Sequence, residues 1–557
     1  MDSDDIVSRC YSGFSGVDFR SEETYLKRSP DSLNLWKDYR EADSIRTRPG
    51  LKLATAFSDP VYGIFFFRGM MLVHSGTTLY KISGGQKKTL YTGLQPAESA
   101  AFVYDDLWYL KDGKHYLQYD GRTIKEVEGY IPTTSIARKP AGGGTTYEDV
   151  NMLSSLRKNT FLADGESTEF YLDAQNLDDS FTPVVTVDDA EVTNFSVDYE
   201  AGKITFDTAP AAPLTDGQDN VTVTFQKTRE GHRERILNCT LLQVFDNRVF
   251  FSGNPDYPNT VFHCSLNDPS YCSDLDYYTE GMDSAAIRGM VAGNNALWVF
   301  REPSDANTTV FYHSPTLDSD YGKIYPSQHS SVTTGCVGKA VNFNDDIVFF
   351  SDRGMEGISG DITTEQVVAH RSSLVDRKMI AEAGYRDMLL EEWEGYLLVF
   401  IGSKVYLADS RTAFTNQDHI EYEWFYWDLE REIACTRVYD GVLYLGTKDG
   451  IYTLNDFEGD VPSYWVTPKD KFKYPNRLKT TNKRGCTLEA TGDFAVYAKT
   501  ESTDFEQISS FEGVEDYAVC RIKRKKFKDL QLKFQSDTRF SLEMVTLESF
   551  IGGYIKR

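Results

Sequence analysis

A short pattern recurs seven times along the chain, and it limits the possible folds more than any other feature. Each copy has an aromatic or small residue, then one or two of Asp, Asn, Glu and Gly, then an apolar run of strand-forming residues. The polar pairs accept positive φ angles and form tight turns, so each copy predicts a turn between two strands. The copies occupy residues 67–72, 104–109, 245–250, 293–298, 343–348, 393–398 and 439–444.

The spacing of the copies indicates a β-propeller. Successive copies begin 37, 141, 48, 50, 50 and 46 residues apart, and blade repeats typically run about 40–50 residues. Several copies continue into a second hairpin, for example at residues 72–80, 399–406 and 444–452. Two hairpins supply the four strands of a blade. The long interval predicts one ordinary blade plus an inserted unit of roughly 95 residues.

The inserted unit has a pattern of its own. It follows the Gly-rich loop at 139–145 and contains five runs that alternate apolar and polar residues, which predicts a small β-sandwich. The expected domains are an N-terminal arm (1–55), blades (56–137), the inserted β-sandwich-like domain (138–230), further blades (231–465) and a C-terminal β region (466–557). The last region either closes the propeller or forms a separate β-domain.

The fold class that we predict is all-β. It comprises about seven propeller blades, an inserted small β-sandwich and a C-terminal β extension. Helical patterns are sparse, and the best one covers residues 372–385. The chain has 557 residues, enough for two or three folded units.

Cysteine placement and net charge narrow the functional classes. The eight cysteines are scattered with no CxxC pair, which favours buried free thiols over zinc sites or a disulfide framework. The formal net charge is −25, which argues against tight DNA binding and fits a passage along which DNA slides. No apolar run reaches the roughly 20 residues of a membrane span, and the first five residues do not resemble a signal peptide. We therefore expect synthesis in the cytoplasm and no membrane span.

Motifs for common catalytic chemistry are absent from the sequence. It contains no HExxH pair, no GxxxxGK[ST] loop, no GxSxG turn and no EF-hand pattern. Acidic residues gather at Glu391, Glu392 and Glu394, but an exposed blade edge explains such a cluster more simply than a glycosidase pair does. We predict no enzymatic activity, no catalytic residue, no cofactor and no metal.

One basic run stands out against the acidic background, and it precedes an alternating strand at 530–534. It is typical of a basic edge strand. It either contacts DNA or an acidic neighbouring subunit, or it is a lysine-guarded edge that prevents wrong strand pairing. Between the two contacts we favour the protein, because the net charge opposes strong attachment to DNA. The candidate contact residues are Arg521, Lys523, Arg524, Lys525, Lys526 and Lys528.

The N-terminal region carries a resemblance to a known class. Residues 11–20, 29–39 and the turn Arg48-Pro49-Gly50 are followed by a block at 61–82. Pro49 fixes φ and Gly50 permits a reversed turn, which predicts that the chain turns here into the first strand. This arrangement resembles the opening of bacteriophage tail-nozzle proteins (tail tubular protein B-like) and DNA-stabilisation hub proteins. Residues 199–206 and 524–534 also look like elements of such proteins.

The resemblance implies a structural virion protein of the tail or head–tail connector. Such a protein forms a ring of copies, for example six, beneath the portal or adaptor, and double-stranded DNA passes through it during ejection. Two alternatives remain open. A sugar-binding or sugar-cleaving phage propeller would have paired carboxylates and exposed aromatics at its axis. A cellular scaffold propeller would repeat WD-type or kelch-type signatures, and Trp427-Asp428 is isolated here.

Overall fold

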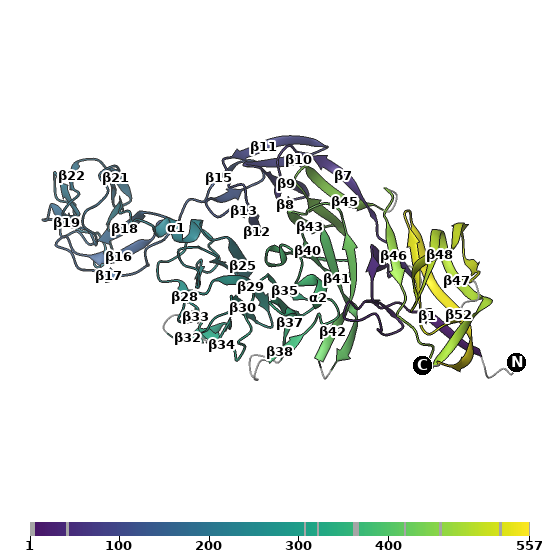
Figure 1. Cartoon of the computed structure of the whole chain (residues 1–557). Coiled ribbons are helices and arrows are strands. Elements are labelled where there is room, and N and C mark those ends of the chain that lie inside the picture. Colours follow the sequence, from purple (N-terminus) through teal and green to yellow (C-terminus); the bar gives the residue numbers. More distant parts are fainter. Residues whose placement is uncertain are drawn as a thin grey trace. The chain divides into compact units, whose positions relative to one another are not determined.

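The computed structural model describes residues 6–40, 44–305, 308–319, 322–359, 367–416, 419–455, 459–522 and 526–555. The chain divides into two compact units, one formed by Met1–Thr89 with Ser330–Arg557 and the other by Leu90–His329. Strands dominate both units (Figure 1). Among the described residues, helix is confined to α1 (His232–Leu237), α2 (Asp376–Met379) and the 3-10 turn η2 (Tyr385–Asp387). The last two fall at the predicted helical segment.

The first unit contains four four-stranded antiparallel blades. The first blade is β8 (Val61–Phe67), β9 (Met70–Ser75), β10 (Thr78–Ser83) and β11 (Gln86–Thr92); the next in this unit is β35 (Ala340–Phe343), β36 (Asp346–Ser351), β37 (Gly354–Ser359) and β38 (Val367–His370). The other two are β39 (Leu389–Trp393), β40 (Tyr396–Ile401), β41 (Lys404–Asn416) and β42 (His419–Asp428), then β43 (Cys435–Tyr439), β44 (Val442–Gly446), β45 (Gly450–Asn455) and β7 (Gly50–Ala56).

The second unit contains three blades of the same kind. They are β12 (Ala100–Tyr104), β13 (Leu107–Lys111), β14 (Tyr116–Tyr119) and β15 (Ile124–Glu126); β25 (Leu241–Phe245), β26 (Arg248–Ser252), β27 (Thr260–His263) and β28 (Tyr277–Thr279); and β29 (Ile287–Gly293), β30 (Ala296–Arg301), β31 (Val310–His313) and β34 (Ser327–His329). A small hairpin, β32 (Thr316–Asp318) and β33 (Gly322–Ile324), accompanies the last blade. The predicted all-β class is confirmed: the chain carries seven blades of a β-propeller.

Each of the seven recurring sequence patterns forms the first hairpin of one blade. In every copy two residues connect the paired strands, as between Tyr104 and Leu107, and both turn residues have positive φ, for example 44° and 59° at Asp105 and Asp106. This is the type I′ geometry, whose twist matches that of the flanking strands. The turns are Arg68-Gly69, Asp105-Asp106, Asp246-Asn247, Asn294-Asn295, Asn344-Asp345, Glu394-Gly395 and Asp440-Gly441.

Within each unit, blades pack against one another through apolar side chains. In the first unit, Phe350 and Val399 belong to one buried cluster that joins two blades. In the second unit, Phe250 and Leu297 do the same. Middle strands such as β30 and β40 are buried at every residue, because both faces of an inner blade strand contact protein. Apolar cores between blades thus stabilise each unit.

The predicted inserted sandwich is present in the second unit. One sheet comprises β17 (Thr145–Thr146), β16 (Thr133–Arg138), β18 (Leu156–Phe161), β24 (Val221–Gln226), β20 (Val184–Val187) and β21 (Ala190–Val192). The other comprises β19 (Glu169–Tyr171), β23 (Lys203–Phe206) and β22 (Phe195–Asp198). Its core includes Phe161, Phe170 and Phe225. The rings of Phe161 and Phe170 meet edge to face, with their centroids 5.4 Å apart.

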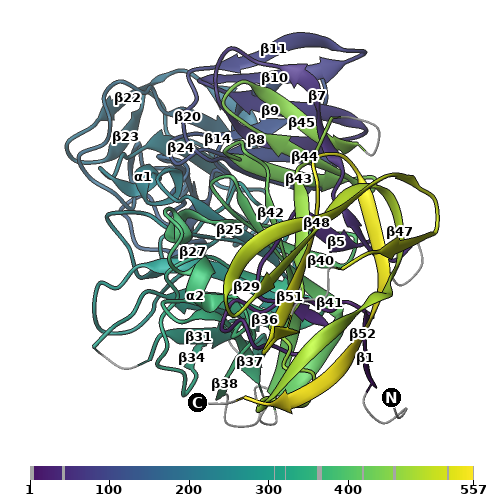
Figure 2. The same ribbon diagram turned by 45° about the vertical axis from the view of Figure 1, so that its right-hand side comes forward.

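The C-terminal region forms a separate eleven-stranded sheet in the first unit, together with strands from the N-terminus. Figure 2 shows its long strands β47, β48 and β52. Its members are β4 (Ser32–Leu33), β46 (Ser463–Val466), β51 (Leu530–Ser536), β47 (Arg477–Thr500), β52 (Phe540–Tyr554), β6 (Ile45–Thr47), β5 (Leu35–Lys37), β1 (Ile6–Ser12), β48 (Thr503–Val514), β49 (Tyr517–Cys520) and β50 (Lys526–Phe527). A short parallel pair, β2 (Gly16–Val17) and β3 (Arg28–Ser29), lies between β1 and β4 in the chain.

The last blade takes its fourth strand from the N-terminal part of the chain. β7 pairs antiparallel with β45, from Gly450 opposite Ala56 to Asn455 opposite Gly50. The segment expected to be only an arm therefore supplies a blade strand, and the C-terminal region does not supply it. Among the described residues, no helix has the length and apolar content that a membrane crossing requires.

Candidate functional site

The Arg48-Pro49-Gly50 motif has a structural role in the first unit. Arg48 is 6% exposed, and its guanidinium donates hydrogen bonds to Oδ1 of Asn34 (3.0 Å), the carbonyl of Pro49 (2.9 Å) and the carbonyl of Asp428 (2.9 Å). Burial lowers the pKa of Arg48 to about 10. Hydrogen bonds from the Arg48 side chain thus connect the start of β7 to the end of β42.

The turn expected at Gly50 is not formed. Gly50 is the first residue of β7 and lies opposite Asn455 in the blade. It is not among the residues with positive φ. The reversal was expected because glycine permits it, but pairing with β45 holds this residue in an extended conformation.

The basic run follows the outer edge of the C-terminal sheet. Arg521, Lys526 and Lys528 are exposed, and Lys526 begins β50. Lys523, Arg524 and Lys525 lie outside the described residues. In the part of the sheet that the structure describes, β49 and β50 each pair with β47 alone, so the run is at an edge.

The edge belongs to one long hairpin. β48, β49 and β50 return antiparallel along β47, with Cys486 opposite Cys520 and Thr480 opposite Lys526. On its other side β47 pairs with β52, and that register breaks between Thr481 and Cys486. The extra residues at this break include Arg484, which is exposed. The structure therefore adds Arg484, from the paired strand β47, to the predicted basic run.

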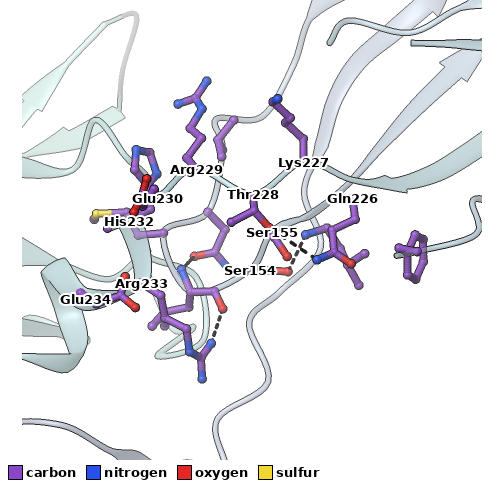
Figure 3. A pocket seen from close by; sticks show the side chains of 17 residues that line it. Ser154, Ser155, Gln226, Lys227, Thr228, Arg229, Glu230, His232, Arg233 and Glu234 are labelled. Carbon is purple, nitrogen blue, oxygen red and sulfur yellow. Dashed lines mark hydrogen bonds between the residues drawn. The ribbon is translucent and has the colours of Figure 1, made fainter. Parts of the chain in front are cut away.

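A hollow of about 500 Å³ lies where the inserted sandwich joins the blades of the second unit (Figure 3). Two of its arginines already have acidic partners. The Arg233 guanidinium donates to the Leu153 carbonyl and lies 3.2 Å from Glu126, and Arg229 lies 2.5 Å from Asp274. Four of the residues labelled around it belong to the link between β24 and α1, and His232 begins α1; the four are Lys227, Thr228, Arg229 and Glu230.

His232 carries a buried ring nitrogen in this hollow. Its Nδ1 is buried and has no partner among the described residues. Burial, and then the positive charges of Arg235 and Arg229, lower the pKa of His232 below its usual 6.5. The imidazole is therefore mainly neutral at pH 7, and the hollow lies between the sandwich and the blades.

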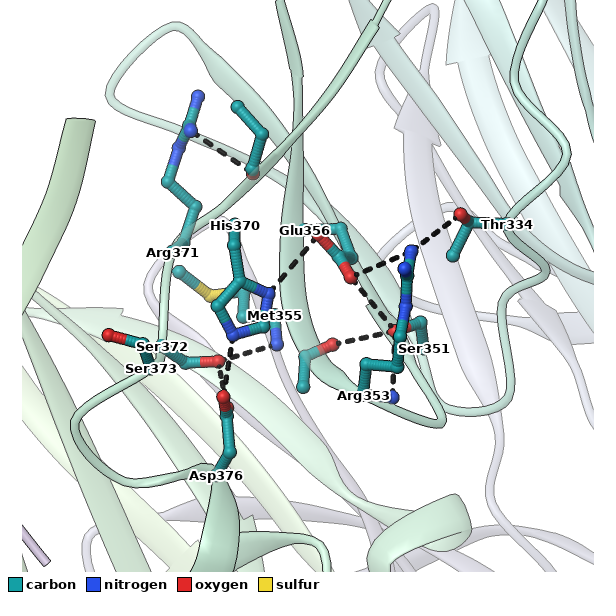
Figure 4. A network of polar contacts seen from close by, with 12 residues as sticks. Thr334, Ser351, Arg353, Met355, Glu356, His370, Arg371, Ser372, Ser373 and Asp376 are labelled. Carbon is teal, nitrogen blue, oxygen red and sulfur yellow. Dashed lines mark hydrogen bonds and ion pairs between the residues drawn. The ribbon is translucent and has the colours of Figure 1, made fainter. Parts of the chain in front are cut away.

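A second polar cluster surrounds His370 in the first unit (Figure 4). Nε2 of His370 lies 2.6 Å from Asp376, and Nδ1 lies 3.3 Å from the buried Glu356. Burial opposes protonation, but the hydrogen bonds and charges of the two carboxylates outweigh it and raise the pKa of His370 to about 10. The imidazolium thereby links β37, β38 and α2.

This cluster is not a nucleophilic triad. The Ser372 hydroxyl donates to Asp376 at 2.5 Å and accepts from the backbone N–H of Met355 at 2.7 Å, so it bonds to the acid and not to the histidine. A triad needs the base to take the proton of the hydroxyl. A protonated histidine between two carboxylates cannot do so, and the cluster stabilises the blade.

The glutamates considered for glycosidase chemistry are separated by their strand. Glu391 and Glu392 are consecutive in β39, so their side chains point to opposite faces. Burial raises the pKa of Glu391, and the positive charge of Arg437 partly offsets this. Glu394 lies in the following turn. Within the described ranges, no group of three or more His, Cys, Asp and Glu residues has the arrangement of a metal site.

Comparison with known proteins gives no family. No family model matches the chain, and no curated protein matches it. Among solved structures, BamB from Moraxella catarrhalis is 11% identical, with a TM-score of 0.34, covering 77% of this chain and 95% of its own. The N-terminal domain of Nup159 is 9% identical, with a TM-score of 0.33, covering 73% and 95%. Hsv2 from Kluyveromyces lactis is 8% identical, with a TM-score of 0.24, covering 66% and 97%. The fold assignment rests on the seven blade sheets.

Sequence reasoning did not find the His370 cluster. Glu356 and His370 meet because β37 and β38 pair in that register. The sequence contains no signal for this meeting, because the alternation of a strand does not say which residue of its neighbour lies opposite. It also gave no sign of α1, whose six residues are too few for a clear helical period.

Proposed function

We propose that the chain is a structural protein of a bacteriophage virion, part of a tail nozzle or head–tail connector. Copies of it would form a ring around the channel through which the genome leaves, next to portal, adaptor or other tail proteins. The observation that carries the proposal is the N-terminal segment. Its resemblance to such virion proteins falls on residues that build the scaffold itself.

That segment contributes to two parts of the first unit. β1, β5 and β6 belong to the C-terminal sheet, and β7 completes the last blade. Arg48, at the centre of the resemblance, is buried among backbone and amide acceptors and not directed to a ligand. A segment used in this way favours a mechanical role, which is what a nozzle or hub requires.

The charge of the chain fits the same role. Asp and Glu outnumber Lys and Arg by 84 to 59, and an acidic lining repels phosphates so that DNA slides without attachment. Apolar contacts between blades give a stiff body, and head-to-tail contacts between identical copies generate rings. Retention of the genome and its ejection would both depend on such a ring.

Electron microscopy of phage particles tests the proposal. The gene is given a small C-terminal tag in a phage that carries it, and purified particles are decorated with gold against the tag. We expect label at the neck or tail, which also separates a connector from a distal tip. Complete particles without label, with an accessible tag and the protein found only in the lysate, would reject the virion role.

A further inference from the structure

Charge is distributed unevenly between two parts of the chain. Residues 138–230 contain 17 Asp and Glu against seven Lys and Arg. Residues 466–557 have the opposite balance, with 18 Lys and Arg against 13 Asp and Glu. A chain with a net charge of −25 therefore keeps a basic segment, and opposite charges on separate surfaces favour association between molecules.

The basic surface is open to a partner. We call Arg484, Arg521, Lys526 and Lys528 the basic edge; all four are exposed, and none forms an ion pair with a residue that the structure describes. The adjoining strand β49 alternates, with Ala518 and Cys520 buried and Tyr517 and Val519 exposed by 57% and 41%. Apolar side chains next to the cations suit a protein surface better than a phosphate backbone.

The acidic surface is an edge of the inserted sandwich. We call Asp188, Asp189, Glu191 and Glu200 the acidic margin. Asp188 and Asp189 form the turn from β20 to β21, Glu191 lies in the edge strand β21, and Glu200 follows β22. All four are exposed, and within the described part of the chain none has an ion-pair partner.

We infer that the basic edge of one molecule binds the acidic margin of a second copy. The contact joins two different surfaces, so it is heterologous. A pair of molecules therefore leaves one basic edge and one acidic margin open for further copies, as a ring or an open chain requires. The inference rests on the proposed function in that it names the contact by which a ring of copies would form. DNA is the competing occupant, and the test separates the two.

The experiment measures the mass of the full-length protein by light scattering at about 50 mM and about 500 mM salt, since screening weakens exposed charge pairs. We expect assembly at low salt and dissociation at high salt. Reversal of charge on either surface should abolish assembly, and a matched reversal elsewhere should not. The three variants are R521E/K526E/K528E, D188K/D189K/E191K and the control K88E/K114E/K139E, whose lysines are exposed.

Mixing gives the decisive result. The two reversed proteins each carry like charges on both surfaces, so each alone should stay monomeric, but together they should assemble because each supplies what the other lacks. Far-ultraviolet circular dichroism checks that all variants are folded. A monomeric natural protein at low salt, assembly by either reversed variant alone, or no recovery on mixing would overturn the inference.

Two further outcomes separate related ideas. If R521E/K526E/K528E assembles normally but loses binding to a short DNA duplex in a gel-shift assay, the basic edge is a DNA contact and the inference is wrong. If the copies assemble as expected but gold never labels phage particles, the contact stands and the virion role falls. The two hypotheses therefore fail on different measurements.

Discussion

His370 makes the stability of its blade depend on pH. His370 is charged because Asp376 and Glu356 hold it, with a pKa of about 10 against 6.5 for a free imidazole. The folded state binds this proton more tightly than the unfolded chain does. The resulting stabilisation is complete below about pH 6.5 and disappears as the pH rises through about 10.

Replacing His370 by Gln should lower the free energy of unfolding by about 1–3 kcal/mol at pH 6, because the buried Glu356 loses a charged donor. The difference from the natural protein should shrink between pH 6.5 and 10. Urea unfolding followed by fluorescence at pH 6, 8 and 10 measures it, with the exposed His329→Gln as control. A difference that is equal at all three pH values would mean that the charge of His370 does not stabilise the fold.

Arg48 is the second residue on which we predict a large effect. Arg48→Ala removes the guanidinium that donates to Asn34 and to the carbonyls of Pro49 and Asp428, so it should cost about 2–3 kcal/mol. Arg48→Lys should recover only part of this, since one ammonium cannot reproduce the fork of the guanidinium. The midpoint of urea unfolding measures both, and the exposed Arg122→Ala should match the natural protein. Equal midpoints for Arg48→Ala and Arg122→Ala would mean that the hydrogen bonds of Arg48 do not stabilise the fold.

At the scale of elements, local signals could be predicted and long-range pairings could not. Turn residues such as Asp105-Asp106 need positive φ whatever surrounds them, so they identified all seven first hairpins. The basic run was predicted as an edge for similarly local reasons. The pairing of β7 with β45 joins segments about 400 residues apart, and the alternation of a strand does not say which strand lies beside it.

The inserted sandwich should fold without the blades. Its two sheets enclose a core of their own that includes Phe161, Phe170 and Phe225. We expect a fragment of residues 130–228 to give well-dispersed amide resonances and cooperative thermal unfolding. Phe170→Ala, which empties a fully buried site at a typical cost of about 3–5 kcal/mol, should unfold the fragment. A random-coil spectrum for the unmodified fragment would show that the sandwich depends on the blades.

For the whole molecule, burial of the cysteines gives a test of the fold in solution. Seven of the eight thiols are buried and Cys10 is exposed. Burial raises the pKa of Cys239 and Cys264 to about 12, so these thiols are protonated and unreactive at neutral pH. An aromatic disulfide reagent should modify one thiol rapidly in the native protein and all eight in denaturant. Fast reaction that persists in Cys10→Ser would mean that a buried core, of the blades or of the C-terminal sheet, is open to solvent.

The origin of the last blade's fourth strand affects biosynthesis. β7 leaves the ribosome early, but its partner β45 ends at Asn455, some 400 residues later. At translation rates of about 5–20 residues per second, the strand waits about 20–80 s without its neighbour. An unpaired apolar strand invites aggregation during such a delay. β7 reads Gly-Leu-Lys-Leu-Ala-Thr-Ala, with small residues and one lysine, and remains mostly exposed even after pairing. A nascent chain can keep such a strand in water until the rest of the propeller has been made.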